Sequence, residues 1–145
     1  MRSSLDVRPH LVGIGLVALL ATVVVHAVHV PRHLPADFTR GLPYLVVGWG
    51  CHALFFYAVG RSRSLEPRSQ MPNMRAADIG VALFLGSIVL SGLLDTAGLT
   101  IAGATVFHVP SAVGIYVGLA LSGWGFGRRT RLVNELASED DNRDR

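Results

Sequence analysis

Residues 11–30 read LVGIGLVALLATVVVHAVHV and contain no Asp, Glu, Lys or Arg. A helix of about 17 to 25 mostly apolar residues is long enough to cross the hydrocarbon core of a bilayer. Lipid offers no hydrogen-bond partners to backbone amides, so a segment that crosses it must form its hydrogen bonds internally, as a helix does. This stretch therefore predicts a transmembrane α-helix.

Three more apolar blocks follow, at residues 42–59, 79–99 and 109–126. The chain has 145 residues, of which 50% are hydrophobic, and its mean hydropathy is +0.44, which is too apolar for a soluble domain of this size. A soluble four-helix bundle would have a charged face on each helix, and none of these blocks has one. We therefore expect an all-α integral membrane protein, a four-helix transmembrane bundle in residues 1–134. The polar residues 135–145 should form a disordered cytoplasmic tail.

The arginines predict an orientation. All 13 basic residues are arginine. Those before the first block, between the second and third, or directly after the fourth are Arg2, Arg8, Arg61, Arg63, Arg68, Arg75, Arg128, Arg129 and Arg131. The other two loops hold only Arg32 and Arg40. Because cytoplasmic loops are enriched in basic residues, we expect both termini on the cytoplasmic side of the plasma membrane. The arginines flank apolar blocks instead of forming one stripe, so we expect no nucleic-acid partner.

Two segments between and within the blocks have alternative interpretations. Arg2 and Arg8 precede an apolar run, and Val-His-Ala at residues 25–27 resembles a cleavage site, so a signal peptide is an alternative to the first span. The run is longer than a usual signal-peptide core, and its removal would leave a start outside the cell, at odds with the arginines. We therefore expect the first span to remain. The loop at residues 60–75, which contains prolines, is typical of an irregular linker.

The second and fourth blocks align with each other at an offset of 67 residues. The matched pairs are Pro43 with Pro110, Val46 with Val113, Ala53 with Ala120, Leu54 with Leu121, and Gly60-Arg61 with Gly127-Arg128. Duplication of a helical hairpin would produce these matches. The narrow choice of residues shared by all transmembrane helices would also produce them, so the sequence leaves both explanations open.

Three histidines gather at the end of the first block. His26, His29 and His33 have the spacing i, i+3, i+7, which puts them along one face of a helix. Pro31 lies among them and, if it ends the helix, would place His33 in the outer loop. His29 and His33 are at the expected membrane interface, where water can satisfy both ring nitrogens.

His26 and Asp95 are expected at the same depth. Each lies four residues inside the outer boundary of its block, about 6 Å at the rise of a helix. A carboxylate in an apolar span should face the bundle interior and find a partner, because exposing its charge to lipid is costly. We therefore predict that the two side chains meet directly or through one water, either as a structural clamp or as a functional pair.

His52 should lie near the middle of the bilayer, about 15 Å below Leu42 by helical rise. It either bonds to a hydroxyl or carbonyl group of a neighbouring helix or belongs to a proton relay or ligand site. His26 and His52 differ in depth by about 9 Å, which is a poor match for the two axial ligands of one haem. No cofactor is strongly implied. The weak candidates for a metal site near the outer face are His26, His29, His108 and Asp95.

The fourth block carries a ladder of small residues, Gly114, Gly118 and Ser122, whose spacing predicts close helix packing. The chain has no P-loop, no Gly-x-Ser-x-Gly and no His-Glu-x-x-His motif, so the sequence gives no support for an enzyme. We expect an accessory, assembly or scaffold subunit of a membrane complex, with the lipid bilayer and other membrane subunits or a second copy as partners. The alternative is a small transporter, or a haem- or metal-linked redox bundle that uses its intramembrane His and Asp residues.

Overall fold

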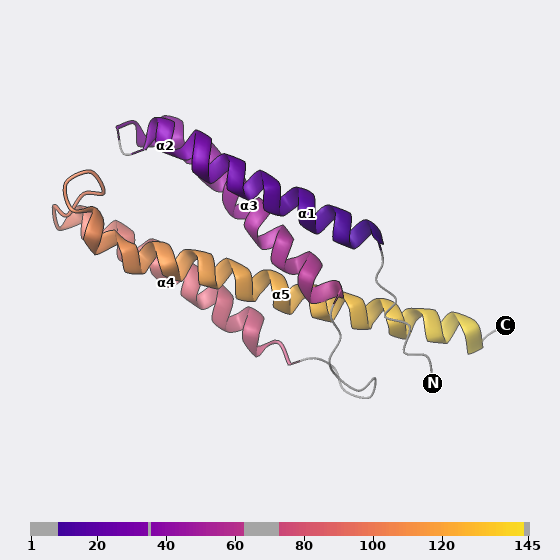
Figure 1. Ribbon diagram of the computed structural model, residues 1–145. Helices are drawn as coiled ribbons and strands as arrows, with labels where there is room; N and C mark the ends of the chain where they lie inside the picture. Colours follow the sequence, from indigo (N-terminus) through magenta and orange to yellow (C-terminus); the bar gives the residue numbers. More distant parts are fainter. Residues whose placement is uncertain (1–8, 35, 63–72, 144–145) are drawn as a thin grey trace.

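The structure is a computed structural model that describes residues 9–34, 36–62 and 73–143, and every regular element in these ranges is helical. The elements are α1 (Pro9–Val24), η1 (Val25–His29), α2 (Val30–His33), α3 (Phe38–Ser62), α4 (Arg75–Thr96) and α5 (Thr105–Arg143), as Figure 1 shows. Because α1, η1 and α2 follow one another without a break, the described residues form 4 rods, each long and apolar enough to cross a membrane. This confirms the all-helical prediction and the apolar blocks. The linker predicted at residues 60–75 lies mostly outside the described residues.

The first rod continues through Pro31 to His33, so the proline does not end the helix. Pro31 has no backbone N–H, and an ordinary α-helical turn would bring its ring against the carbonyl four residues earlier. The turn directly before it is a π-helix, in which the Val30 N–H bonds to the Val25 carbonyl. This change from α-helical to π-helical hydrogen bonding is a common way for a helix to accommodate a proline.

The third rod ends at Thr96, three residues before the predicted boundary at Leu99. Gly98 has φ +83°, a left-handed conformation that favours glycine. The Leu99 N–H bonds to the Leu94 carbonyl at 2.9 Å, and the Gly98 N–H bonds to the Asp95 carbonyl at 3.0 Å. This is the Schellman arrangement that ends many helices. Asp95 therefore lies in the last turn of α4 and not deep inside the span.

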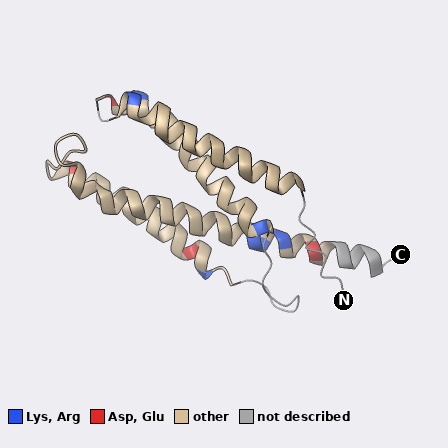
Figure 2. Cartoon of the chain, viewed as in Figure 1, with Lys and Arg blue, Asp and Glu red and all other residues tan. Residues whose placement is uncertain are grey.

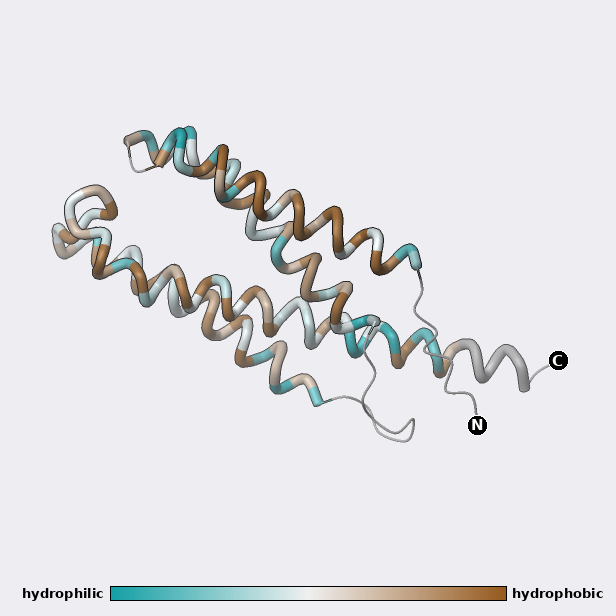
Figure 3. Tube along the Cα trace, viewed as in Figure 1, coloured by the Kyte–Doolittle hydropathy of each residue, from teal (hydrophilic) through white to brown (hydrophobic). Residues whose placement is uncertain are grey.

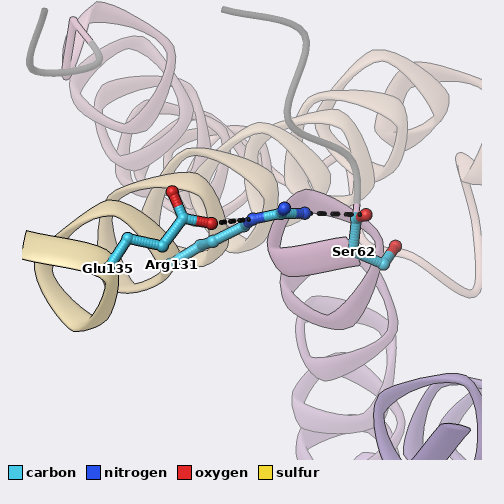
Figure 4. Close-up of polar contacts among 3 residues, drawn as sticks. All are labelled: Ser62, Arg131 and Glu135. Carbon is cyan, nitrogen blue, oxygen red and sulfur yellow. Dashed lines mark hydrogen bonds and ion pairs between the residues drawn. The ribbon is translucent and has the colours of Figure 1, made fainter. Parts of the chain in front are cut away.

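The fourth rod is longer than predicted, because residues 135–143 continue α5 instead of forming a disordered tail. Arg131 supports this continuation, as Figure 4 shows: its Nε donates to Glu135 Oε1 at 2.7 Å, one turn further along the helix. Its Nη1 donates to the Ser62 carbonyl at 3.1 Å. The same guanidinium therefore extends α5 and caps the C-terminal end of α3.

The four rods of the described residues pack against one another in an open row. Within the described residues α1 packs on α3, α3 on α5, and α5 on α4, and no contact links the first rod to α4. Figure 1 shows two helical hairpins, α1 with α3 and α4 with α5. We call the end that holds the α2–α3 and α4–α5 connections the hairpin end, and the opposite end, where Arg61 and Arg131 lie, the arginine end.

Small residues let α5 approach both neighbours closely. Towards α4, Gly114 lies against Ser87, and a Cβ added to Gly118 would come within 2.6 Å of the Gly80 carbonyl oxygen. A Cβ on Gly80 would in turn lie 2.6 Å from the Ser122 nitrogen. The ladder of Gly114, Gly118 and Ser122 therefore faces α4, where backbone-level packing takes the place of side-chain interdigitation.

The contact between α3 and α5 is reciprocal. A Cβ added to Gly60 would strike the Trp124 carbonyl oxygen, and one added to Gly127 would strike the Tyr57 carbonyl oxygen. Gly60 and Gly127 are 67 residues apart, and so are Tyr57 and Trp124. The two contacts are therefore related by a local two-fold axis between α3 and α5. The helices α1 and α4 flank this pair on either side. This is the arrangement that duplication of a hairpin predicts.

The spacing between α3 and α5 changes along their length because their facing residues change in size. At the arginine end the helices meet through Gly60 and Gly127. Nearer the hairpin end, the large side chains Trp49 and Tyr116 stand at matching positions, again 67 residues apart. The two hairpins therefore diverge towards the hairpin end, where a cavity opens between them.

Candidate functional site

The cavity has a volume of about 790 Å³, within the range of small-molecule sites. It lies between the N-terminal half of α3, the C-terminal end of α4 and the N-terminal half of α5. Its walls are mostly apolar side chains, including Phe38, Leu42, Leu45, Ile88, Val109 and Ile115. Its polar lining comes chiefly from Trp49, Ser91, Asp95, His108, Ser111 and Tyr116. It is the candidate functional site of the described chain.

His108 holds one wall of the cavity together. It is 7% exposed, its Nε2 donates to the Leu99 carbonyl at 2.6 Å, and its Nδ1 lies 3.0 Å from the Ser91 hydroxyl. A carbonyl oxygen can only accept, so Nε2 carries a proton, and the neutral tautomer then accepts the Ser91 O–H at Nδ1. One ring therefore joins α5 to α4 and to the α4–α5 connection, with both nitrogens satisfied.

Ser111 and Trp49, which both line the cavity, carry buried polar groups. Ser111 is 2% exposed, and its buried hydroxyl has no hydrogen-bond partner in the structure. The Trp49 Nε1–H is also buried and lies near the Tyr116 hydroxyl without a hydrogen bond of ordinary geometry. A buried polar group without a partner costs free energy, so native proteins usually satisfy it. Of the two, the Ser111 hydroxyl is the group beside the cavity that has no neighbouring polar partner in the structure.

Asp95 lies at the mouth of the cavity, exposed, in the last turn of α4. The C-terminal end of a helix carries partial negative charge, so a carboxylate there is mildly unfavourable for the helix itself. Within the described residues no hydrogen bond or ion pair joins its side chain to another residue. Helix stability therefore does not account for this carboxylate.

The predicted pair of His26 with Asp95 is wrong. The first rod packs on α3 and has no backbone contact with α4, whereas α4 packs mainly on α5 and reaches α3 through the Phe84 and Trp49 rings. The two residues therefore lie on opposite sides of the α3–α5 pair. The depth argument matched them along the membrane normal and could not place them within the membrane plane. His26 instead lies against Gly48, with its ring edge-on to Tyr116 at 5.2 Å between centroids, and its Nδ1 donates to the Thr22 carbonyl at 2.8 Å.

His52 bonds to a carbonyl of a neighbouring helix, one of the two alternatives from the sequence. Its Nε2 donates to the Tyr116 carbonyl of α5 at 3.1 Å, and its ring lies edge-on to the Tyr116 ring at 5.2 Å. His26 contacts the same tyrosine ring, so Tyr116 joins the first and second rods to α5. Neither histidine lines the cavity.

His29 and His33 do not share the surroundings of His26, because the π-helical turn changes the helical register between them. Both rings stack on Tyr44 of α3, with centroids 5.3 Å away in each case. These contacts fasten the end of the first rod to the beginning of the second.

The weak metal candidates are not brought together. His26 is at the α1–α3–α5 junction, His29 is on Tyr44, His108 is bonded at both nitrogens, and Asp95 is at the cavity mouth. Among the residues that the structure describes, no group of three or more His, Cys, Asp or Glu side chains is placed to hold a metal ion.

Sequence reasoning missed Trp49, Ser111 and Tyr116 as cavity residues. A signal for two of them was present, because Trp49 and Tyr116 occupy equivalent positions in the 67-residue alignment, one in each hairpin. Equivalent residues of two repeats are related by the two-fold axis, and substrate sites of repeat-built membrane proteins often lie at the interface between the repeats. Ser111 carried no comparable signal. No protein-family model, no curated protein and no solved structure matches the chain.

Proposed function

We propose that the chain is an integral protein of the plasma membrane, with both termini and the α3–α4 connection in the cytoplasm. Large apolar side chains on the outer rods support insertion: Leu16, Val17 and Leu20 of α1 are 61%, 69% and 65% exposed. Such a surface is unfavourable in water and suits contact with lipid. Charged side chains gather towards the ends of the rods (Figure 2), and apolar residues dominate between them (Figure 3).

Site-specific labelling tests the orientation. In a Cys51→Ala background, Ala36→Cys should react with a membrane-impermeant maleimide on intact cells, because residue 36 is exposed at the hairpin end. Asn73→Cys, exposed beside the start of α4, should react only after the membrane is made permeable. The reverse pattern would overturn the proposed orientation.

We further propose that the protein acts as an accessory or scaffold subunit of a membrane complex. The main support for this proposal is that His52 and His108 each form a hydrogen bond to a backbone carbonyl of another segment. Such groups position helices. The open row also leaves the outer faces of α1 and α4 uncovered by the other described helices, available to lipid or to a neighbouring subunit.

A transporter is the second candidate, since the cavity lies between two hairpin repeats, where transporter sites are often found. A transport route would have to continue to the arginine end. There Gly60 and Gly127 bring the backbones of α3 and α5 into direct contact, which leaves no room for a passage between them. A transporter would therefore have to separate α3 and α5 at these glycines in a second conformation.

Co-purification tests the subunit proposal. The full chain, expressed at its natural level and extracted in a mild detergent, should retain a membrane partner in a fixed ratio. Replacing Leu20 of α1 and Val89 of α4, 65% and 60% exposed, by tryptophan should reduce the amount retained if these outer faces bind the partner. Gly50→Ala, where an added methyl group meets nothing within 4 Å, is the matched control and should leave it unchanged. Recovery of the chain alone, at the same yield as the variants, would contradict the proposal.

A further inference from the structure

We propose that the cavity between the hairpins is a binding site for a lipophilic cation: a largely apolar molecule that carries one positive charge, which pairs with Asp95. This goes beyond the proposed role as a subunit and does not rest on it. The inference combines the shape of the cavity, its charge and its unpartnered polar groups.

The shape of the cavity fits an apolar body. Along α5 its lining extends from Thr105 to Tyr116, about 16 Å at the rise of a helix. Aliphatic and aromatic side chains form most of the wall, and they favour an apolar ligand because both surfaces leave water on binding. The cavity is closed towards the arginine end by the contact of Gly60 with Trp124. A ligand would therefore enter with its polar end towards the mouth.

The charge of the cavity fits a cation. Asp95 is the one carboxylate among the described residues that line it, and no arginine is among them. His108 forms both of its hydrogen bonds as the neutral tautomer. In this arrangement it does not offset the negative charge of Asp95. The site therefore offers an anionic mouth to its ligand.

Buried polar groups below the mouth indicate where the ligand would make a second contact. The Ser111 hydroxyl is 2% exposed and has no partner, and it lies among the lining residues of the same cavity. It could donate to an oxygen or to an aromatic face of the ligand. A lipid acyl chain would fill the space without satisfying either Ser111 or Asp95, so a cation complements the site better.

Binding of radiolabelled tetraphenylphosphonium to the purified full chain in a nonionic detergent tests the inference. We expect saturable binding of one cation per chain by equilibrium dialysis, and a rise in the melting temperature. Tetraphenylborate has nearly the same size and shape with the opposite charge, so it should bind at least tenfold more weakly. Asp95→Asn removes the charge at an exposed position with little change in shape, and should weaken phosphonium binding at least tenfold.

Two further variants separate the site from general effects. Asp78→Asn removes another exposed carboxylate of α4, outside the cavity, and should leave phosphonium binding unchanged. Ala112→Trp fills the cavity and should abolish binding, while a helical circular dichroism spectrum reports that the variant is folded. Equal binding of the borate, unchanged affinity of Asp95→Asn, or absence of saturable phosphonium binding would each overturn the inference.

Discussion

Gly127→Ala is expected to destabilise the protein by about 1 to 3 kcal/mol, the usual cost of forcing an extra group into a packed interface. The added methyl group would strike the Tyr57 carbonyl oxygen of α3. Because that atom belongs to the backbone, no rotation of a side chain can relieve the contact, and α3 and α5 must move apart. Reversible unfolding in mixed micelles, followed by circular dichroism, measures the loss.

The reciprocal variant and a control make this prediction specific. Gly60→Ala should cost about as much as Gly127→Ala, since its methyl group would strike the Trp124 carbonyl in the equivalent contact. Gly50→Ala lies on the same helix as Gly60 but meets nothing within 4 Å, so it should be neutral or slightly stabilising. Equal stability of all three variants would show that α3 and α5 do not pack through these glycines.

His108→Leu is expected to be the second strongly destabilising change, by about 1 to 3 kcal/mol. The leucine side chain occupies a similar volume but leaves the Leu99 carbonyl and the Ser91 hydroxyl without their present partner. The α4–α5 connection should then loosen, and hydrogen exchange at residues 97–104 should become faster. The same unfolding assay gives the free energy.

Two variants show which bond matters. Ser91→Ala removes only the bond at Nδ1 and should cost less than His108→Leu, because the carbonyl of Leu99 keeps its donor. His29→Leu loses its stacking on Tyr44 and a weak 3.5 Å approach to the Val24 carbonyl, but it leaves no buried polar group without a partner, so it should cost less than His108→Leu. If His29→Leu lowered the free energy of unfolding as much as His108→Leu, this would contradict the proposed role of His108 in joining α5 to α4.

The number and position of the rods could be predicted because they depend on local composition alone. An uncharged run such as residues 11–30 has one stable form in lipid, and its length follows from the bilayer. The end of α4 at Thr96 was missed because it depends on the left-handed conformation of Gly98, one residue inside an otherwise apolar run. The extension of α5 was missed because the polar composition of residues 135–145 indicates disorder, although the Arg131–Glu135 pair, one helical turn apart, joins this segment to the preceding turn.

The candidate site was less predictable for the same reason. Depth along a helix follows from residue numbers, and on that basis His26 and Asp95 were predicted at the same depth, although α4 ends at Thr96 and places Asp95 in its last turn. Which helices are neighbours depends on packing surfaces, and α3 and α5 separate these two residues. For His52 the sequence offered a bond to a hydroxyl or carbonyl of a neighbouring helix or a place in a relay or ligand site, and the structure has the bond to the Tyr116 carbonyl. The cavity itself arises from the contrast between glycine contacts at one end and Trp49 and Tyr116 at the other, a property of two helices together.

The reciprocal contact of Gly60 and Gly127 has a consequence for assembly. If the two hairpins were separate molecules, this contact would be the isologous interface of a two-fold symmetric dimer, in which each glycine receives a carbonyl of the other chain. Such a dimer would dissociate on dilution in the membrane. Joining the hairpins in one chain replaces that encounter by an intramolecular one, whose effective concentration is set by the connecting segment. When the hairpins are joined in one chain, the sequence of each can also differ from that of the other. Asp95 is present in one hairpin only, whereas a symmetric pair of identical hairpins could not have a cavity with a single negative charge.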